Sequence, residues 1–260
     1  ILALESAMAT DMLIPKTLKS ASAARPGAAP LLTVRGLETW YGESHVLHGI
    51  DFDVHAGEVV TLLGRNGAGK TTTLKSIMGV IGKRKGHVAF DGTDTISMPS
   101  RQIARLGIGY VPEERGIYAS LSVEENLLLP PKVREGGLSV EEVFELFPNI
   151  KERLKSQGTK LSGGEQQMLA IGRILRTGAH FLLLDEPTEG LAPVIIDQIG
   201  ATIRKLKREG YTIILVEQNF RFAQTVSDRH YVVEQGRVID MIPNAELDAN
   251  IDKLHGYLGV

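Results

Sequence analysis

The residues best suited to chemistry begin at position 64, where the chain reads Gly-Arg-Asn-Gly-Ala-Gly-Lys-Thr. Small residues let the backbone curl so that successive N–H groups point inward at a phosphate group. Lys70 adds a full positive charge, the hydroxyl of Thr71 suits Mg²⁺, and the helix expected to follow offers its positive N-terminus. A glycine-rich turn beside a surface lysine is the alternative. This loop follows a strand pattern and opens a helix pattern, however, which indicates a nucleotide phosphate loop.

A pair of carboxylates follows a short apolar run later in the chain. Residues 181–184 are Phe-Leu-Leu-Leu, and Asp185 and Glu186 come next. In an open α/β sheet, ligands bind at the carboxyl ends of the strands. We therefore expect Asp185 to hold Mg²⁺ through water and Glu186 to accept a proton from the attacking water. Alone, such a pair often marks only a solvated strand end; the phosphate loop is what makes it indicate hydrolysis.

A third motif, Leu-Ser-Gly-Gly-Glu-Gln-Gln, begins at residue 161. Ser162 and Glu165 have the spacing of a capping box, so an ordinary helix start is one interpretation. Two glycines, Gly163 and Gly164, cost about 1 kcal/mol each in a helix, and they favour a second interpretation in which another molecule approaches this helix end. Its N–H groups and the Ser162 hydroxyl would then bind an anion. With a phosphate loop in the same chain, that anion is expected to be the γ-phosphate held by a second copy.

Strand and helix patterns alternate around these motifs. Strand patterns cover residues 31–34, 46–54, 57–63 and 86–90, and a helix pattern covers residues 70–78. After residue 162 the chain predicts a helix to about 176, a strand to 184, a helix over 194–208 and a strand to 216. Alternation of this kind predicts an α/β domain with a mainly parallel sheet.

The segment between these two halves has a different character. Capping boxes begin at Ser122 and Ser139 with no strand pattern between them, which predicts an inserted helical lobe over about residues 116–159. Residues 1–30 are rich in Ala, Ser and Pro and lack periodicity. We expect them to form a tail that is mobile or not native to the protein, ahead of a domain over residues 31–260.

Composition narrows the class of protein further. The chain has 260 residues, 43% of them hydrophobic, and a formal net charge of −2, which gives no electrostatic argument for a nucleic-acid partner. It has no cysteine, so disulfides and thiolate metal sites are excluded. No apolar run approaches the ~20 residues needed to span a bilayer.

These motifs, in this order, resemble the ATP-binding domain of ABC transporters over residues 31–260. The resemblance implies a P-loop NTPase fold of ABC type, with an antiparallel N-terminal β-subdomain and an inserted helical subdomain. It also implies that Tyr41 stacks on adenine, although an ordinary core tyrosine is the alternative. The nucleotide contacts that it implies are Tyr41, Gly64, Asn66, Gly67, Gly69, Lys70, Thr71, Thr72, Glu113, Ser162, Gly163, Gly164, Glu165 and Asp185.

Three positions depart from the commonest family pattern. Glu113 stands where many relatives carry a Gln that touches Mg²⁺ and senses the membrane partner, and Ala192 replaces a frequent Asp at the dimer seam. Gln218 replaces the usual His that contacts the γ-phosphate. The expected Mg²⁺ contacts are therefore Thr71, Glu113 and Asp185, and the expected catalytic residues are Glu186 and Gln218. A degenerate site that does not hydrolyse ATP is the alternative, although Glu186 remains in place.

The departures also point to a subfamily. Residues 161–173, 185–193, 216–219 and 256–260 are similar to the LivF-type ATPases of branched-chain amino-acid importers. Urea, short-amide and lipid transporters with similar ATPases remain alternatives, as does a soluble ABC protein acting on DNA or ribosomes. The resemblance implies a homodimer, or a heterodimer with a LivG-type paralogue, that sandwiches two ATP molecules. It also implies separate transmembrane permease subunits and a peripheral position at the cytoplasmic face of the inner membrane. Because the net charge is near neutral, we expect no nucleic-acid partner.

Overall fold

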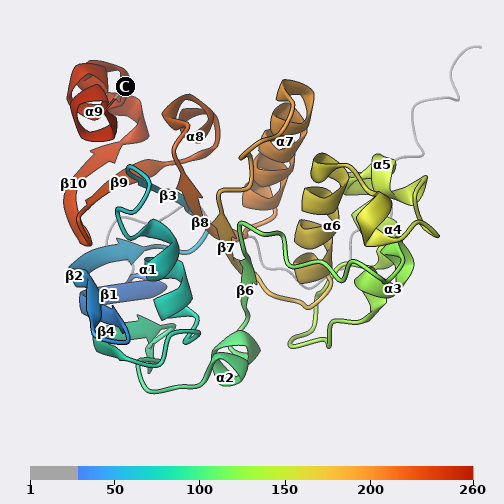
Figure 1. Cartoon of the computed structure of the whole chain (residues 1–260), viewed down its shortest axis with the longest axis horizontal. Coiled ribbons are helices and arrows are strands. Elements are labelled where there is room, and N and C mark those ends of the chain that lie inside the picture. Colours follow the sequence, from blue (N-terminus) through green and yellow to red (C-terminus); the bar gives the residue numbers. More distant parts are fainter. Residues whose placement is uncertain (1–28, 260) are drawn as a thin grey trace, which may run out of the picture.

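The computed structural model describes residues 29–259, which form two sheets and the helices that cover them (Figure 1). The first sheet has four antiparallel strands in the order β2-β1-β4-β5. Its strands are β1 (Leu32–Tyr41), β2 (Ser44–Val54), β4 (Arg84–Phe90) and β5 (Thr93–Asp94). The expected antiparallel N-terminal sheet is therefore confirmed.

The second sheet is mainly parallel, as the alternation of strands and helices predicts. Its order is β10-β9-β3-β8-β7-β6, and β10 alone among these six runs antiparallel to its neighbour. The strands β3, β7 and β8 are buried along their whole length, as expected for parallel strands covered on both faces. The bounds are β3 (Val59–Leu63), β6 (Ile108–Val111), β7 (Phe181–Asp185), β8 (Thr212–Glu217), β9 (Arg229–Glu234) and β10 (Arg237–Pro243).

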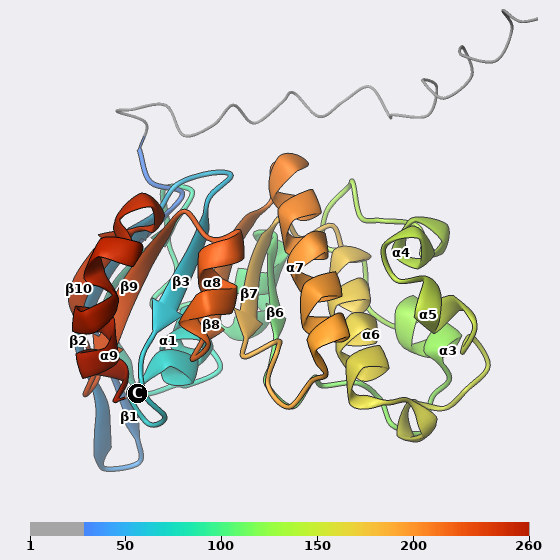
Figure 2. The same cartoon turned by 90° about the horizontal axis from the view of Figure 1, so that it is seen from above.

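Helices cover both faces of the parallel sheet. Figure 2 shows α7 and α8 lying along one side of the strands, while α3, α4 and α5 group at the end of the molecule beyond α6. The helices are α1 (Lys70–Ile77), α2 (Ser100–Arg105), α3 (Val123–Leu128), α4 (Val140–Leu146), α5 (Pro148–Lys151), α6 (Gly163–Leu175), α7 (Pro193–Arg208), α8 (Phe220–Val226) and α9 (Ile251–Leu258). Short 3₁₀ turns cover Gly158–Lys160, Asn244–Glu246 and Asp248–Asn250.

Alternate residues of the parallel strands face two separate cores. In β7, Leu182 and Leu184 pack into the core that contains α6 and α7, whereas Leu183 packs into the core shared with α1 and the N-terminal sheet. This alternation follows from the period of two along a strand. The phosphate-loop helix α1 is consequently held between the two sheets, with Leu74 and Ile77 buried in the second core.

The segment over residues 116–159 contains α3, α4, α5 and the first 3₁₀ turn. Both predicted capping boxes are present: the Ser122 hydroxyl accepts the N–H of Glu125, and the Ser139 hydroxyl accepts the N–H of Glu142. The one strand-like contact within this part of the described chain is an isolated bridge between Ser122 and Gln157. Apart from Ala29 and Pro30, the tail expected over residues 1–30 lies outside the described residues.

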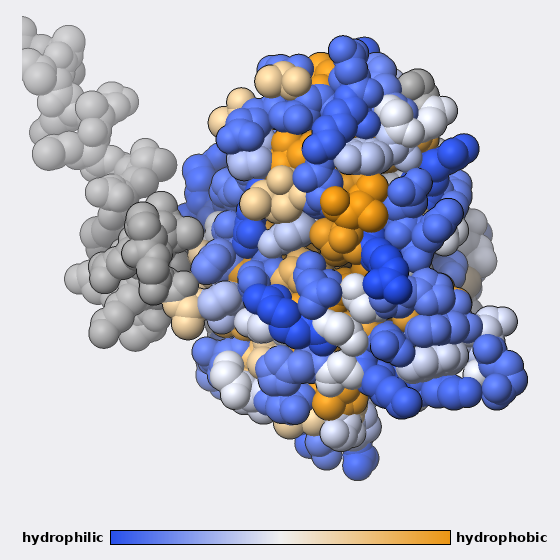
Figure 3. All heavy atoms as spheres, turned by 90° about the vertical axis from the view of Figure 1, so that its left-hand side faces the viewer, coloured by the Kyte–Doolittle hydropathy of each residue, from blue (hydrophilic) through white to orange (hydrophobic). Residues whose placement is uncertain are grey.

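Several elements were not predicted from the sequence, namely β5, β6, β9, β10, α2, α8 and α9. The hairpin of β9 and β10 is closed by Gln235 and Gly236, both with positive φ, a backbone geometry that suits a tight turn. The face that carries β10 shows scattered hydrophobic groups among hydrophilic ones (Figure 3), and Ile239 and Met241 of β10 are exposed. Over residues 29–259, no helix combines the length and apolar character needed to cross a membrane.

Candidate active site

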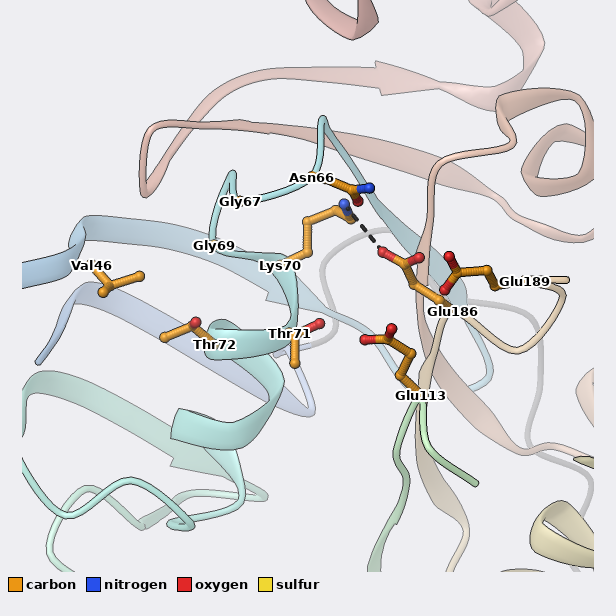
Figure 4. Close-up of a pocket in the computed structure, with 10 residues that line it drawn as sticks. All are labelled: Val46, Asn66, Gly67, Gly69, Lys70, Thr71, Thr72, Glu113, Glu186 and Glu189. Carbon is orange, nitrogen blue, oxygen red and sulfur yellow. Dashed lines mark ion pairs between the residues drawn. The ribbon is translucent and has the colours of Figure 1, made fainter. Parts of the chain in front are cut away.

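A cavity of about 340 Å³ opens at the carboxyl ends of β3 and β7. Figure 4 shows Lys70, Thr71 and Thr72 on one side of it and three glutamates on the other. It is lined by Val46, Asn66, Gly67, Gly69, Lys70, Thr71, Thr72, Glu113, Glu186 and Glu189. Eight of these ten residues were expected from the sequence, and Val46 and Glu189 were not.

The loop between β3 and α1 has a shape that only glycine permits at key points. Gly67 and Gly69 both have positive φ, of 78° and 108°. A Cβ on Gly64 would lie 2.3 Å from the carbonyl oxygen of Val233, and a Cβ on Gly69 would lie 2.8 Å from the side chain of Leu47. The loop therefore packs tightly against β2 on one side and β9 on the other. A Cβ on Gly67 would meet nothing within 4 Å, so this backbone faces open space that a phosphate can occupy.

Lys70 fixes this loop from within. Its side chain is 4% exposed, and its ammonium donates to the carbonyl oxygens of Gly64 at 2.8 Å and Arg65 at 3.2 Å. The same Nζ lies 3.4 Å from Oε1 of Glu186 (Figure 4). Gly69 at the N-cap of α1 has no side chain to cap the first N–H groups of this helix, and residues 69–72 line the cavity. These N–H groups and the positive helix end are therefore available to a ligand there. The arrangement fits the phosphates of a nucleotide.

Asp185 is buried, is not among the residues that line the cavity, and is held by two hydroxyl groups. Thr71 Oγ1 donates to its Oδ1 and the hydroxyl of Tyr110 donates to its Oδ2, each at 2.9 Å. Burial raises the pKa of Asp185, while the hydrogen bonds from Thr71 and Tyr110 oppose this shift. Burial, followed by the Asp185 carboxylate, also raises the pKa of Tyr110.

The pair of Thr71 and Asp185 suits Mg²⁺, which uses one or two carboxylates together with substrate phosphates and water. No group of three or more His, Cys, Asp or Glu side chains within residues 29–259 could hold a metal by itself. The oxygen pair therefore matches a metal that arrives with its nucleotide. Tyr110 was missed by sequence reasoning, because its contact with Asp185 depends on the pairing of β6 with β7.

Glu186 projects into the cavity from a strained turn. Its φ is +46°, which is unusual for a residue with a side chain, and its backbone N–H donates to the carbonyl oxygen of Val216 at 3.0 Å. Gln218 Nε2 donates to its Oε2 at 2.7 Å. The structure thus brings together the two residues expected to be catalytic, and it places the carboxylate of Glu186 between an amide and an ammonium.

Two further carboxylates, Glu113 and Glu189, line the same cavity and are exposed. Desolvation raises the pKa of Glu189, and the carboxylates of Glu186 and Glu113 raise it further. A nearby negative charge disfavours the ionised form of a carboxyl group, which explains the contributions of Glu186 and Glu113. Glu189 follows Glu186 by three residues, and this closeness in sequence is the one feature that could have predicted its place at the cavity.

The motif at residue 161 lies away from this cavity, at the start of α6. Its capping box is present: the Ser162 hydroxyl accepts the N–H of Glu165, whose carboxylate in turn accepts the N–H of Ser162. A Cβ on Gly164 would lie 2.9 Å from the Ile195 side chain, so contact within this chain already requires that glycine. Gly164 is thus explained by packing within the chain, whereas the sequence alone had suggested a second molecule as the reason for both glycines. Ser162 itself is exposed, and none of residues 162–165 lines the cavity.

Tyr41 ends β1 and is 48% exposed, so it is not an ordinary core tyrosine. It is also absent from the cavity lining, and its stacking on adenine stays a prediction. Ala192 is the N-cap of α7 and is exposed, on the segment that follows the Asp185–Glu186 turn.

Comparison with known proteins agrees with this geometry. The family model described as "ABC transporter" matches residues 47–189. The chain is 42% identical to the high-affinity branched-chain amino acid transport ATP-binding protein BraG of Pseudomonas aeruginosa, over 88% of this chain and 100% of that protein. The chain belongs to the ABC transporter family. It is an ATPase of that family and binds ATP.

Other ABC family members are also similar. A probable branched-chain amino acid transport ATP-binding protein, LivF of Archaeoglobus fulgidus, is 38% identical over 80% of this chain and 89% of its own length. The lipopolysaccharide export ATP-binding protein LptB of Escherichia coli K12 is 36% identical, over 80% and 88% respectively. A solved dimer of an ATP-binding cassette with ADP and inorganic phosphate has a TM-score of 0.72 at 22% identity, covering 82% of this chain and 98% of that one. That last likeness confirms the fold.

One buried carboxyl group beside the site was not among the residues expected to bind nucleotide or Mg²⁺ or to take part in catalysis. Glu217, the last residue of β8, is 3% exposed. Burial raises its pKa to about 7, the Thr188 hydroxyl and the Asn219 N–H oppose that shift, and the Glu186 carboxylate adds to it.

Glu217 gives the free energy of unfolding a pH dependence. Between about pH 4.5 and 7 the folded protein keeps a proton on Glu217 that the unfolded chain loses, so folded-state stability falls as the pH rises through this window. The difference of about 2.5 pKa units between 4.5 and about 7 corresponds to about 3 kcal/mol. Glu217→Gln removes the titrating group, and its free energy of unfolding relative to the parent should rise between about pH 5 and pH 8. Urea unfolding at both pH values measures this, with the exposed Glu43→Gln as control. A pH-independent difference would show that Glu217 ionises as it does in the unfolded chain.

Proposed function

We propose that this chain powers the import of branched-chain amino acids, or similar solutes, through a separate membrane permease. The observation that carries the proposal is its 42% identity to BraG over the whole of that protein. LptB, an export ATPase, covers less of this chain and is 36% identical. Glu113 lines the cavity, and Gln218 donates a hydrogen bond to Glu186 of its lining. Both residue types fit the resemblance to LivF-type importers better than a lipid exporter.

The cavity supports a specific division of labour in hydrolysis. The loop over residues 64–69, Lys70 and the N-terminus of α1 bind the phosphates, and Thr71 with Asp185 holds Mg²⁺. When bound, Mg²⁺ neutralises charge on the phosphates. Glu186 accepts the proton of the attacking water, and Gln218 orients that water and the γ-phosphate by hydrogen bonds.

The Lys70–Glu186 contact must change when ATP binds. In the structure, the ammonium of Lys70 is shared by two carbonyl oxygens and the Glu186 carboxylate. A γ-phosphate carries more negative charge than one carboxylate and competes for the same cation. Glu186 is then released to accept a proton from water, while Gln218 retains its contact from the β8 side.

A second ATPase copy completes the site in this proposal. The start of α6 exposes Ser162 and the first N–H groups of that helix, away from the chain's own cavity. Such a helix end binds an anion. The related cassette solved as a dimer with ADP and phosphate supports an assembly of two chains, here either two copies or one copy and a LivG-type paralogue. Tyr41 would stack on adenine at the cavity rim.

The permease is proposed to contact the helical lobe over residues 116–159, with Glu113 at the hinge. The lobe lies at the opposite end of the molecule from the N-terminal sheet in both views (Figures 1 and 2). Exposed Leu128 and Leu129 at the end of α3 provide apolar surface there. With the permease in the inner membrane, the proposal includes a peripheral position of this chain at the cytoplasmic face and no nucleic-acid partner.

Glu186→Gln should keep ATP affinity while lowering turnover at least about a hundred-fold, because an amide cannot accept the water's proton. The stalled enzyme should also appear as an ATP-dependent dimer in size-exclusion chromatography. The matched control is Glu189→Gln, a change of the same kind at an exposed residue of the same cavity. Turnover equal to that of the parent would show that Glu186 is not the base.

Ser162→Arg should leave ATP binding to the monomer intact and abolish both dimer formation and hydrolysis. The bulky cation blocks a close approach of the second copy's γ-phosphate to the start of α6. Ser139→Arg is the control, because it breaks an equivalent capping box at the start of α4. Hydrolysis at similar rates in Ser162→Arg and the parent would mean that α6 completes no site across a dimer.

Cells that lack this chain should lose uptake of labelled leucine or isoleucine, and the parent chain should restore it whereas Glu186→Gln should not. Uptake of labelled urea, followed in the same cells, tests the alternative solute class. If leucine and isoleucine enter normally while urea uptake falls, the proposed solute is wrong although the importer assignment stands. An outer-membrane lipopolysaccharide defect with normal solute uptake would favour the export alternative instead.

A further inference from the structure

We propose that Glu217 is a positioning residue for hydrolysis, which joins the turn after β7 to the turn after β8 and so sets Gln218 against Glu186. The proposal rests on the catalytic roles given above to Glu186 and Gln218. Glu217 itself faces no nucleotide: it is buried and is not among the residues that line the cavity. Its partner is Thr188, which is buried as well.

The connection consists of one short hydrogen bond. Thr188 Oγ1 donates to Glu217 Oε1 at 2.7 Å, and the two side chains are 5% and 3% exposed. Thr188 comes two residues after Glu186, and Glu217 comes directly before Gln218. The bond therefore spans the same two turns as the Gln218–Glu186 hydrogen bond, which is also 2.7 Å long.

Backbone contacts complete this link between the two strand ends. The Glu186 N–H donates to the Val216 carbonyl oxygen at 3.0 Å, which extends the β7–β8 pairing by one residue. The backbone N–H groups of Asn219 and Gln218 lower the pKa of Glu217, in opposition to the effect of burial. On its other side, Glu217 pairs with Leu63, the residue that precedes the phosphate loop. Glu217 thus contacts or adjoins all three segments that must align for the water to attack.

A carboxyl group at position 217 is not what packing of the core alone would favour. The five preceding residues of β8 are Thr-Ile-Ile-Leu-Val, and an apolar side chain at position 217 would continue this buried run at no desolvation cost. A buried carboxyl group instead carries a desolvation cost that its hydrogen bonds only offset. The groups that offset this cost are the Thr188 hydroxyl and the N–H groups of Asn219 and Gln218. All of them belong to the two turns that carry Glu186 and Gln218.

Paired substitutions test the link from both ends. Glu217→Leu and Thr188→Val each remove one partner, and each should lower kcat by about ten-fold while changing the KM for ATP less than about two-fold, since only the transition-state arrangement is disturbed. Glu217→Gln keeps an oxygen that can accept from Thr188, and Thr188→Ser keeps the hydroxyl. Both conservative variants should stay within about three-fold of the parent in kcat. The double variant that combines Glu217→Leu with Thr188→Val should be no slower than either single variant, because both changes break the same bond.

The matched control is Thr202→Val, the same chemical change at another buried threonine whose hydroxyl bonds the Gln198 carbonyl oxygen in α7. Its kcat should equal that of the parent. Thermal unfolding of every variant identifies loss of folding, and if Glu217→Leu does not fold, the Thr188→Val and Thr188→Ser pair carries the test. A parental kcat in Thr188→Val overturns the proposal. So does a kcat that falls equally in Thr188→Val and Thr188→Ser, or equally in Thr188→Val and Thr202→Val.

Two further variants separate this inference from the proposed function. Glu186→Gln and Gln218→Ala are measured in the same assay. If both variants have a lowered kcat while Thr188→Val has the parental kcat, the catalytic roles of Glu186 and Gln218 stand and the positioning role of Glu217 is wrong. If both retain parental turnover, the proposed roles of Glu186 and Gln218 fail first, and the positioning role falls with them.

Discussion

The arrangement of the whole site depends on one buried ammonium, that of Lys70. A charge that is 4% exposed must be neutralised or hydrogen-bonded, and here the carbonyl oxygens of Gly64 and Arg65 and the carboxylate of Glu186 meet that requirement. The carbonyl contacts impose the curl of the phosphate loop. The carboxylate contact holds Glu186 over the cavity from the end of another strand. One charge therefore defines the loop and the position of the expected base together.

Parallel pairing explains how residues far apart in sequence reach this ammonium. The strands β6, β3, β7 and β8 run in the same direction, so their carboxyl ends lie along one edge of the sheet. Each strand end contributes a different group: β3 the phosphate loop, β6 Tyr110, β7 Asp185 with Glu186, and β8 Gln218. The two cores fix the strands on both faces, which keeps these groups at hydrogen-bonding distance.

Local sequence patterns predicted much of this and missed what depends on pairing. The phosphate loop, the Asp185–Glu186 pair and the capping boxes at Ser122, Ser139 and Ser162 are set by residues within a few positions of one another, and the structure has them all. The contact of Tyr110 with Asp185 spans 75 residues, and its existence depends on which strands are neighbours. The same holds for Thr188 with Glu217 and for Ile195 against Gly164. No spacing rule could reveal these contacts before the strand order was known.

The close fit of the phosphate loop against its surroundings has a thermodynamic consequence. A Cβ on Gly64 would meet the Val233 carbonyl oxygen at 2.3 Å, and the N–H of Gly236 donates to the Ala68 carbonyl oxygen at 2.8 Å. The loop thus has its curled shape before any nucleotide arrives. Ordering a flexible loop of this length would otherwise oppose binding by roughly 1 kcal/mol or more per residue. That conformational entropy is already lost on folding. The free energy of the phosphate contacts is therefore not reduced by the cost of ordering the loop when nucleotide binds.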